Sequence, residues 1–390
     1  MTTTRRHFLV AGAALPFAVR AFALRPEPRW VLLGTDTGDA IFRAPWNAAT
    51  GEIGKQEVAI ATARPDFFAM HPTLPVLYSV NSVGDGEKPN PARKPAVSSF
   101  RVKAATAELS LLNTVSSHGD GPCYIAVHPT GKALYVANYS AGSFAAYSLA
   151  KDGSLVDEPA TLLNCHTEPV CGRVGPVSDR QDASHLHCTT LSPDGQYVVV
   201  CDLGTDSLLV FPLAPHTALP QVSGMHRTPA RPGSGPRHVA FHPNGHWLYC
   251  VHELDGTIDL YDWNHGQPTL RTGSAMSTFA KGATRRGASG CELLISPDGR
   301  FAYTCNRGVD DVVVYRIEAK SGALQEQQRF PCGGKVPRIF AFDPSRRWLA
   351  VCNQSAPGTV AVFAHDPETG HVQPKPKIFA ANTPMFLQWL

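Results

Sequence analysis

Short apolar segments separated by turn-forming residues recur at regular intervals along the chain. A His/Ser-Pro-x-Gly motif stands between two such segments in four places: His128-Pro129-Thr130-Gly131, Ser192-Pro193-Asp194-Gly195, His242-Pro243-Asn244-Gly245 and Ser296-Pro297-Asp298-Gly299. Two weaker copies, His71-Pro72 and Asp343-Pro344, lack the glycine. Asp-Gly or Asn-Gly between apolar segments is a strong signal for a β-hairpin. The pattern therefore predicts six hairpins, each made of a first and a second strand.

The hairpins repeat at a nearly constant interval, and this interval indicates the architecture. Their prolines lie 57, 64, 50, 54 and 47 residues apart. A third apolar strand follows in each unit, and the remaining spacer has room for a fourth. Four strands per roughly 50 residues, repeated in tandem, are typical of a β-propeller. We therefore predict an all-β fold of four-stranded antiparallel blades.

The two ends of the chain indicate how many blades there are. Residues 383–390 have the pattern of one more first strand, and residues 30–34 and 39–43 have the pattern of a second and a third. If these strands join, they form a seventh blade that closes the ring and protects its sheet edges. The sequence thus predicts a seven-bladed β-propeller over residues 24–390, with its seventh blade closed by the N- and C-terminal strands.

Composition agrees with this fold and excludes one class of function. Of 390 residues, 33 are glycine and 33 are proline, more than usual but fewer than in disordered chains. Hydrophobic residues make up 43% of the chain, enough to fill a core. Lys plus Arg number 35 against 32 Asp plus Glu, for a net charge of +3. Proteins that wrap nucleic acid carry a strong basic excess, so no nucleic-acid partner is predicted.

Residues 1–23 have the pattern of a twin-arginine export signal. Arg5 and Arg6 precede an apolar run to Val19, and the segment ends in Ala-Phe-Ala. The apolar run is shorter than the roughly 20 residues that a membrane span needs. The alternative is an ordinary N-terminal helix. We expect the twin-arginine translocase to export the chain to the periplasm, with a mature protein that starts near Leu24 and has no membrane span.

The ten cysteines do not have the spacing of a metal site, because no Cys-x-x-Cys pair is present. Cys165 and Cys171 flank a polar loop and are candidates for a disulfide after export, which the sequence leaves open. Four others lie in apolar strand patterns and are expected to be small buried hydrophobic residues: Cys201, Cys250, Cys305 and Cys352.

Counting outward from each hairpin turn places one residue of each first strand, and one of each second strand, at a common level. The first-strand residues are Asp66, Cys123, His187, Arg237, Cys291, Arg338 and Met385. The second-strand residues of the first six blades are Ser82, Tyr139, Leu203, Glu253, Arg307 and Gln354. First strands line the channel of a propeller, so these side chains are expected to converge at one mouth of it. A β-bulge would shift this register by one residue.

Four residues at this level are candidate catalytic groups: His187, Arg237, Glu253 and Arg307. Charged side chains beside apolar neighbours are costly to bury unless they are paired. The alternative interpretation is that Arg237 and Glu253 form an ion pair that only joins two strands. A histidine and a second arginine at equivalent positions of neighbouring blades favour a functional site instead.

Other polar residues near the motifs have different predicted roles. We predict that three residues at the mouth bind substrate: His185, His238 and Arg338. The histidines that precede the turn prolines, at the opposite end of each hairpin, are expected to be turn or surface residues: His71, His128 and His242.

The chain also resembles the seven-bladed propeller lactonase family, which includes bacterial 6-phosphogluconolactonases and the fungal carboxy-cis,cis-muconate cyclase. The motifs that carry the resemblance are Arg180-Gln181, His185-Leu186-His187, Gly235-Pro236-Arg237-His238, His252-Glu253-Leu254, Glu292 and Asn306-Arg307-Gly308. The resemblance implies that the family's active-site His, Arg, Glu and Arg fall on His187, Arg237, Glu253 and Arg307. Two positions depart from the family pattern: Ser82, where a glutamate is frequent, and Tyr124, where a histidine is common.

The resemblance implies a 6-phosphogluconolactonase-like hydrolase that opens a sugar or other anionic lactone with no cofactor. Either Glu253 or His187 would activate water, and the arginines would bind an oxyanion or an anionic group of the substrate. They would also repel a metal ion, so no metal is predicted. The alternatives are a cyclase-type lyase or cycloisomerase and a non-catalytic periplasmic binding propeller. The expected partner of the mature chain, a predicted monomer, is a small-molecule lactone.

Overall fold

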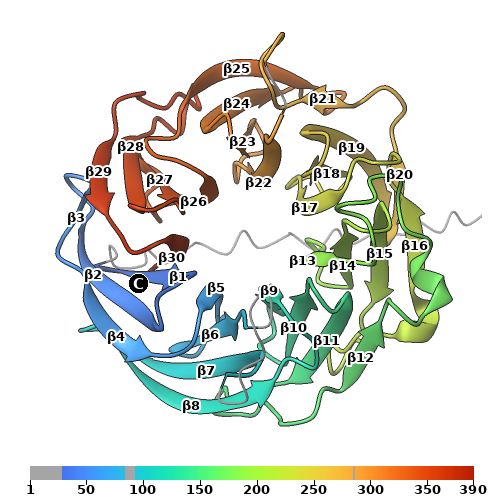
Figure 1. The fold of residues 1–390 in the computed structure, drawn as a ribbon, viewed down its shortest axis with the longest axis horizontal. Helices are drawn as coiled ribbons and strands as arrows, with labels where there is room; N and C mark the ends of the chain where they lie inside the picture. Colours follow the sequence, from blue (N-terminus) through green and yellow to red (C-terminus); the bar gives the residue numbers. More distant parts are fainter. Residues whose placement is uncertain (1–28, 84–92, 284–285) are drawn as a thin grey trace, which may run out of the picture.

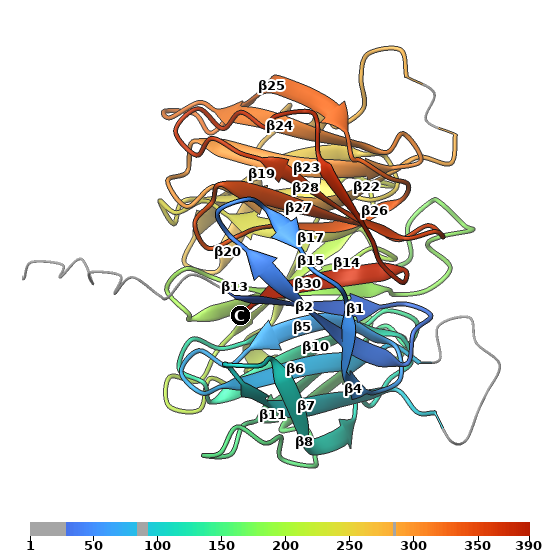
Figure 2. The ribbon, with the colours of Figure 1, turned by 90° about the vertical axis from the view of Figure 1, so that its left-hand side faces the viewer.

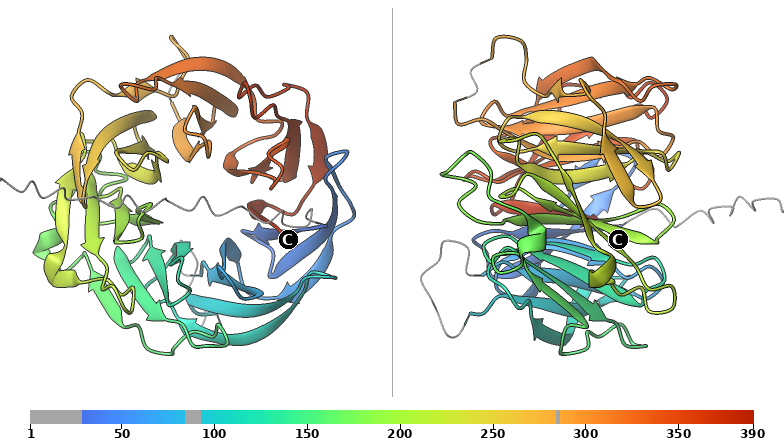
Figure 3. Two further views of the ribbon diagram at one scale, coloured as in Figure 1. Left: turned by 180° about the vertical axis from the view of Figure 1, so that it is seen from behind. Right: turned by 90° about the vertical axis from the view of Figure 1, so that its right-hand side faces the viewer.

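Seven antiparallel sheets surround a central axis (Figure 1), as the repeat predicted. The computed structural model describes residues 29–83, 93–283 and 286–390. The predicted export signal, residues 1–23, and the expected start of the mature chain at Leu24 lie outside the described residues. The ring is shorter along its axis than across it (Figure 2), and the view from behind shows the same circular arrangement (Figure 3).

Each blade begins with the strand nearest the axis. The first three blades are β5 (Pro65–Met70), β6 (Val76–Asn81), β7 (Ala96–Lys103) and β8 (Glu108–Ser116); β9 (Pro122–Val127), β10 (Ala133–Asn138), β11 (Ser143–Ser148) and β12 (Thr161–Asn164); and β13 (Leu186–Leu191), β14 (Tyr197–Asp202), β15 (Ser207–Pro212) and β16 (His226–Pro229). Two short 3₁₀ helices, η1 (Pro169–Cys171) and η2 (Val222–Gly224), lie in connecting segments.

The next three blades follow the same order. They are β17 (Pro236–Phe241), β18 (Trp247–His252), β19 (Thr257–Asn264) and β20 (Gln267–Leu270), with β21 (Met276–Ser277) also on β19; β22 (Ser289–Ile295), β23 (Phe301–Arg307), β24 (Asp311–Ile317) and β25 (Leu324–Pro331); and β26 (Pro337–Phe342), β27 (Trp348–Asn353), β28 (Thr359–Ala364) and β29 (Lys377–Ala380).

The seventh blade joins the two ends of the described chain, as predicted. Its strands are β30 (Pro384–Trp389), β1 (Trp30–Thr35), β2 (Ala40–Asn47) and β4 (Glu57–Ala61), with β3 (Glu52–Ile53) on the end of β2. β30 pairs with β1 from Val31↔Trp389 to Thr35↔Pro384. The C-terminal strand is therefore the innermost strand of a blade whose other strands come from the start of the fold.

The hydrophobic core lies between blades. Each of the seven clusters of buried apolar side chains found in the described residues combines strands of two neighbouring blades; one contains Tyr135 of β10 and Val198 of β14, another Leu32 of β1 and Leu77 of β6. The hydrophobic faces of each blade are thus covered by its neighbours in the ring. Covering the faces of the first and last blades requires the ring to close.

The recurring tyrosine of the second strand explains part of the repeat motif. Tyr78, Tyr135 and Tyr249 are fully buried. Each hydroxyl donates a hydrogen bond to a backbone carbonyl of the next blade, at Gly153, Ala218 and Gly322, over 2.7, 2.5 and 2.7 Å. A buried hydroxyl needs such a partner, so this position both fills the core and links adjacent blades.

The turns at the other end of the inner hairpins also link blades. The motif glycines have positive φ angles of 67° to 74°, a conformation that glycine adopts without strain. His71, His128 and His242 lie in these turns, as expected, and each ring nitrogen Nε2 contacts the glycine carbonyl of the next turn, at 3.3, 2.9 and 2.8 Å. His71 and His128 are buried by this contact, so they are not the surface residues that the sequence suggested.

The cysteines fall into two groups. Cys165 and Cys171 are joined by a disulfide, which settles the alternative that the sequence left open. Cys201, Cys250, Cys305 and Cys352 are free and buried, as predicted. Among residues 29–83, 93–283 and 286–390, no helix combines the length and the apolar character that crossing a membrane requires.

Candidate active site

A one-residue β-bulge interrupts the pairing of every innermost strand near the same end of the channel. On β13, Leu186 pairs with Asp202 and Cys188 with Cys201, which leaves His187 without a partner in the ladder. The other six shifts also leave first-strand residues outside the ladder, and on β5 and β22 the following residue is unpaired as well. The residues at the predicted level are Asp66, Cys123, Arg237, Cys291, Arg338 and Met385. A bulge redirects a side chain out of the regular alternation, and it does so here at every predicted first-strand position.

The bulges also correct the predicted pairing of Arg237 with Glu253. Pro236 pairs with His252 and His238 with Val251, so Arg237 has no Cα partner and Glu253 follows the end of β18. The backbone N–H of Glu253 donates to the Gly235 carbonyl over 2.8 Å, which holds the carboxylate beside the bulge. The two side chains meet as expected, although the strand register is shifted.

Glu253 is the centre of a buried charge cluster. Its Oε2 atom lies 3.0 Å from Nε of Arg237 and 2.7 Å from Nη2 of Arg307, and its Oε1 lies 2.6 Å from Nη2 of Arg180. Glu253 is 3% exposed and Arg237 is 1% exposed. Burial raises the pKa of Glu253, but the charges of Arg307 and Arg237 outweigh burial and hold this pKa well below its usual value. Glu253 is therefore an ionised carboxylate that binds protons weakly.

His187 has the opposite character. Burial, together with the charges of Arg237 and His238, lowers the pKa of His187 well below its usual value, so its ring is neutral at pH 7. Nε2 lies 3.7 Å from Oε2 of Glu253, and Nδ1 has no hydrogen-bond partner among the described residues. The neutral ring therefore has one nitrogen without a proton, which can accept one, whereas the Glu253 oxygens are held by three guanidinium groups.

A second layer of polar contacts supports Arg237. Its Nη1 donates to the Cys291 carbonyl over 2.7 Å. His238, next along β17, contacts Oε1 of Glu292 through Nδ1 at 3.0 Å, and both side chains are buried. Burial lowers the pKa of His238. The Arg237 guanidinium is thus held by Glu253, by the Cys291 carbonyl of β22 and by the neighbouring His238 ring.

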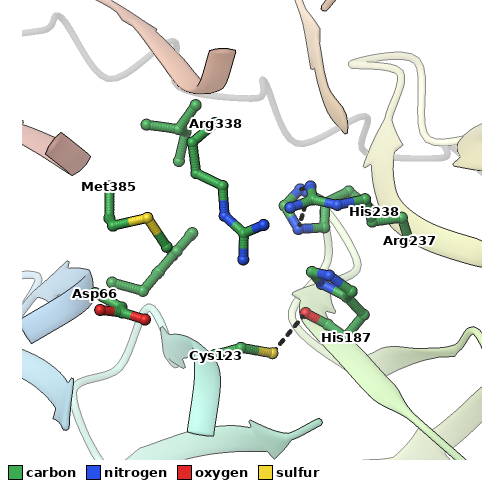
Figure 4. Close-up of a pocket in the computed structure, with 9 residues that line it drawn as sticks. Asp66, Cys123, His187, Arg237, His238, Arg338 and Met385 are labelled. Atoms are coloured by element: carbon green, nitrogen blue, oxygen red, sulfur yellow. Dashed lines mark hydrogen bonds between the residues drawn. The ribbon is translucent and has the colours of Figure 1, made fainter. Parts of the chain in front are cut away.

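These residues surround two adjoining hollows at the channel mouth. The outer hollow measures about 220 Å³ and the inner one about 20 Å³, roughly one water. Both are lined by Asp66, Cys123, His187, Arg338 and Met385. In Figure 4 the Arg338 guanidinium extends into the middle of the pocket, between Asp66 and Met385 on one side and His187 on the other. No ion pair of Arg338 occurs within the described part of the chain.

Comparison with known proteins agrees with this geometry. A family model described as "Lactonase, 7-bladed beta-propeller" matches residues 30–389. The chain belongs to this lactonase family. It is 29% identical to the 6-phosphogluconolactonase of Bacillus subtilis over 338 residues, which is 87% of this chain and 90% of that protein. It is 30% identical to the 6-phosphogluconolactonase of Formosa agariphila over 299 residues, covering 75% of this chain and 80% of the relative.

The fold of this lactonase-family protein also matches solved structures. The periplasmic gluconolactonase PpgL of Pseudomonas aeruginosa superposes with a TM-score of 0.82 and is 29% identical, covering 93% of this chain and 98% of that one. Family membership thus agrees with the resemblance found in the motifs, and the named relatives support a lactone hydrolase at the level of the family.

The structure places most of the sequence-predicted site residues of this lactonase-family protein around one pocket. His187, Arg237, Glu253 and Arg307 come together, and His238 and Arg338 line the same region. His185 does not line either hollow. Its ring stacks on Tyr139 at 4.6 Å, and its Nε2 contacts Asp182, so it faces its own loop rather than the substrate space.

Two residues with clear roles in the pocket were not among the predicted site residues. Arg180 comes from the connection between η1 and β13, and its sequence signal was the Arg180-Gln181 motif, which carried part of the family resemblance but was given no role. Asp66 was placed at the mouth by counting but was given no role. Within the described ranges no group of three or more His, Cys, Asp or Glu side chains is arranged to hold a metal ion.

Proposed function

We propose that this protein hydrolyses a sugar lactone or another anionic lactone at the channel mouth. The observation that carries the proposal is a pocket in which a buried neutral histidine, His187, faces guanidinium groups. Ester hydrolysis needs a base that activates water and a cation that stabilises the oxyanion on the carbonyl. The lactonase-family relatives support this reaction class over a scaffold.

His187 is the proposed general base. Glu253 is already bound by three guanidinium groups, so its oxygens are not free to take a proton from water. The neutral imidazole of His187 can take a proton from a water molecule as that water attacks the lactone carbonyl. Glu253 then stabilises the imidazolium that forms, because its Oε2 lies 3.7 Å from the ring.

Arg307 and Arg338 are the proposed oxyanion and substrate-binding groups. The Nε atom of Arg307 is buried and has no hydrogen-bond partner within the described residues, although Nη2 binds Glu253. Arg338 extends into the pocket with no ion pair in the described part of the chain (Figure 4). A guanidinium stays charged at neutral pH and presents several donors to an oxyanion or carboxylate.

The charge of the mouth favours an anionic substrate. Three guanidinium groups surround a single carboxylate at Glu253, and Arg338 adds another positive charge. We also propose export to the periplasm, on the basis of the paired arginines Arg5 and Arg6. A periplasmic enzyme meets unphosphorylated sugar lactones or carboxylated lactones more readily than cytoplasmic sugar phosphates, and one similar structure is named a periplasmic gluconolactonase.

The test is a panel of aldonolactones and muconolactones, assayed with the mature chain with and without chelator. His187→Asn is expected to lower kcat/KM by at least about 100-fold, the usual contribution of a general base. His242→Asn, in a turn at the other end of an inner hairpin, is the control. In the wild type, kcat/KM should remain level as the pH falls through about 6.5 and decline only below it, because the pKa of His187 is lowered.

Three results would contradict parts of the proposal. Wild-type kcat/KM in His187→Asn would remove His187 as the base. Lactone formation from an unsaturated diacid, with no hydrolysis, would indicate the cyclase-type reaction on the same arginines. Lactone binding without turnover by the wild type would indicate a binding propeller.

A further inference from the structure

Asp66 is a buried carboxyl group in the wall of the pocket, on the side opposite His187 (Figure 4). It lies in the bulge of β5, lines both hollows and is 6% exposed. Its Oδ1 atom is buried and has no hydrogen-bond partner among the described residues. Leaving a polar atom buried without a partner is costly, so such an atom calls for an explanation.

The surroundings of Asp66 favour the protonated, neutral form of its carboxyl group. Burial raises the pKa of Asp66 to about 8, and the negative charge of Asp36 acts in the same direction. Arg64 and Arg338 lower this pKa but do not reverse the shift. One reason is that Arg64 is already paired with Asp36, Nη2 to Oδ1 at 2.6 Å.

β1, which packs against β5, is followed by one other carboxylate of the pocket wall, Asp36, and this carboxylate is already paired with Arg64. Ser82 after β6, Cys123 of β9 and Met385 of β30 line the pocket beside β5, and Arg338 of β26 lines it as well. Across the pocket are Glu253, bound to its arginines, and the neutral ring of His187. At neutral pH the pocket therefore holds a neutral imidazole that can accept a proton and, on the opposite wall, a protonated carboxyl that can donate one.

We propose that Asp66 is the general acid that protonates the ring oxygen of the lactone as this oxygen leaves. The inference rests on the proposed lactone hydrolysis. Water forms a bond to the carbonyl carbon while His187 takes one of its protons. The bond between the carbonyl carbon and the ring oxygen then breaks, and the O–H proton of Asp66 goes to that oxygen. One lactone and one water give one hydroxy acid; His187 then releases its proton to solvent and Asp66 regains one, which restores the enzyme.

The substrate comparison that tests this role uses two lactones with different leaving groups. Glucono-δ-lactone releases an alkoxide, which needs a proton, whereas dihydrocoumarin releases a phenolate, whose conjugate acid has a pKa near 10. In Asp66→Asn, kcat/KM for gluconolactone is expected to fall about 100-fold, and kcat/KM for dihydrocoumarin less than about threefold. Asp194→Asn, in the turn of another inner hairpin, is the matched control and should change neither.

The pH dependence provides a second readout. The wild type should lose activity on gluconolactone above about pH 8 as Asp66 ionises, and the residual activity of Asp66→Asn should lack this decline. Stability should follow the same group. A carboxyl whose pKa is raised in the folded state stabilises the fold most at low pH, and this contribution is lost as the pH rises toward 8. Asp66→Asn should therefore raise Tm relative to the wild type at pH 8.5 but not at pH 4.

The outcomes separate this role from the reaction itself. If the wild type hydrolyses neither these two lactones nor any member of the panel described above, the proposed function is wrong and the role of Asp66 is wrong with it. If the wild type hydrolyses both but Asp66→Asn retains full activity on gluconolactone, or loses activity equally on both lactones, the reaction stands and the general-acid role is overturned. If the difference in Tm between Asp66→Asn and the wild type is the same at pH 4 and pH 8.5, the inference that the buried Asp66 carboxyl is protonated is overturned.

Discussion

The buried polar side chains at the two ends of the innermost strands have different kinds of partner. At the turn end, which comprises the His/Ser-Pro-x-Gly turns, polar side chains have nearby backbone or uncharged partners: His128 contacts the Gly195 carbonyl at 2.9 Å, and Asp194 accepts from the Ser192 hydroxyl and from the Gln196 N–H. At the mouth end, which comprises the seven bulge residues and Glu253, the partners are other charged side chains from different blades.

The mouth end also leaves polar groups incompletely matched. Nδ1 of His187, Oδ1 of Asp66 and Nε of Arg307 are buried without partners in the described residues, and positive charges outnumber negative ones around Glu253. Native proteins pair nearly all buried polar atoms, and exceptions concentrate where function needs them. The paired polar groups of the turn end thus stabilise the fold, whereas the unpaired polar groups of the mouth end lower its stability and remain available for catalysis.

The largest expected effect comes from removing the anion at the mouth end. Glu253→Ala would leave Arg180, Arg237 and Arg307 without their common carboxylate, and an uncompensated buried charge costs about 3–5 kcal/mol. Denaturant unfolding should show this loss, with lactone hydrolysis lost as well. Glu326→Ala, which breaks an exposed pair with Arg329, is the control and should cost about 1 kcal/mol or less. Equal losses in the two variants would contradict the comparison.

A smaller effect is expected from changing the shape of a cation while its charge is kept. Arg237 contacts Glu253 through Nε and the Cys291 carbonyl through Nη1, two directions that a lysine ammonium cannot reach together. Arg237→Lys should lower kcat/KM at least about tenfold, or about 1.4 kcal/mol of barrier. Steady-state kinetics would measure this loss, with Arg329→Lys, on the outer strand β25, as the control variant. Wild-type rates in Arg237→Lys would show that only charge matters there.

The smallest effect is expected at the turn end. His128→Ala removes one contact between blades and should lower the free energy of unfolding by about 1 kcal/mol. It should leave kcat/KM within about twofold of the wild type, since His128 lies in a turn and lines neither hollow of the pocket. His216→Ala, on an exposed loop, is the control for stability. A loss of activity without a loss of stability in His128→Ala would show that the two ends are not independent.

Much of the mouth end could be located from the sequence because every blade departs from regular pairing in the same way. Counting from each turn led to Asp66, Cys123, His187, Arg237, Cys291, Arg338 and Met385, and each of these lies in a bulge. Because the same bulge occurs in every innermost strand, counting the same number of residues from each turn leads to equivalent positions in all blades. The strand register itself could not be read, because a bulge leaves no mark in the pattern of apolar residues.

The sequence by itself determined the propeller, its seven blades and the joining of its ends, since these depend on local strand and turn patterns repeated in phase. Only the tertiary structure decided the chemistry of the mouth. It placed Arg180 2.6 Å from Glu253, which is 73 positions away in the sequence. It also stacked His185 on Tyr139, outside the pocket lining, and buried Asp66. The charge state of a side chain depends on its burial and on charges a few ångströms away. Those distances are set by the closing of the ring, and no single repeat contains them.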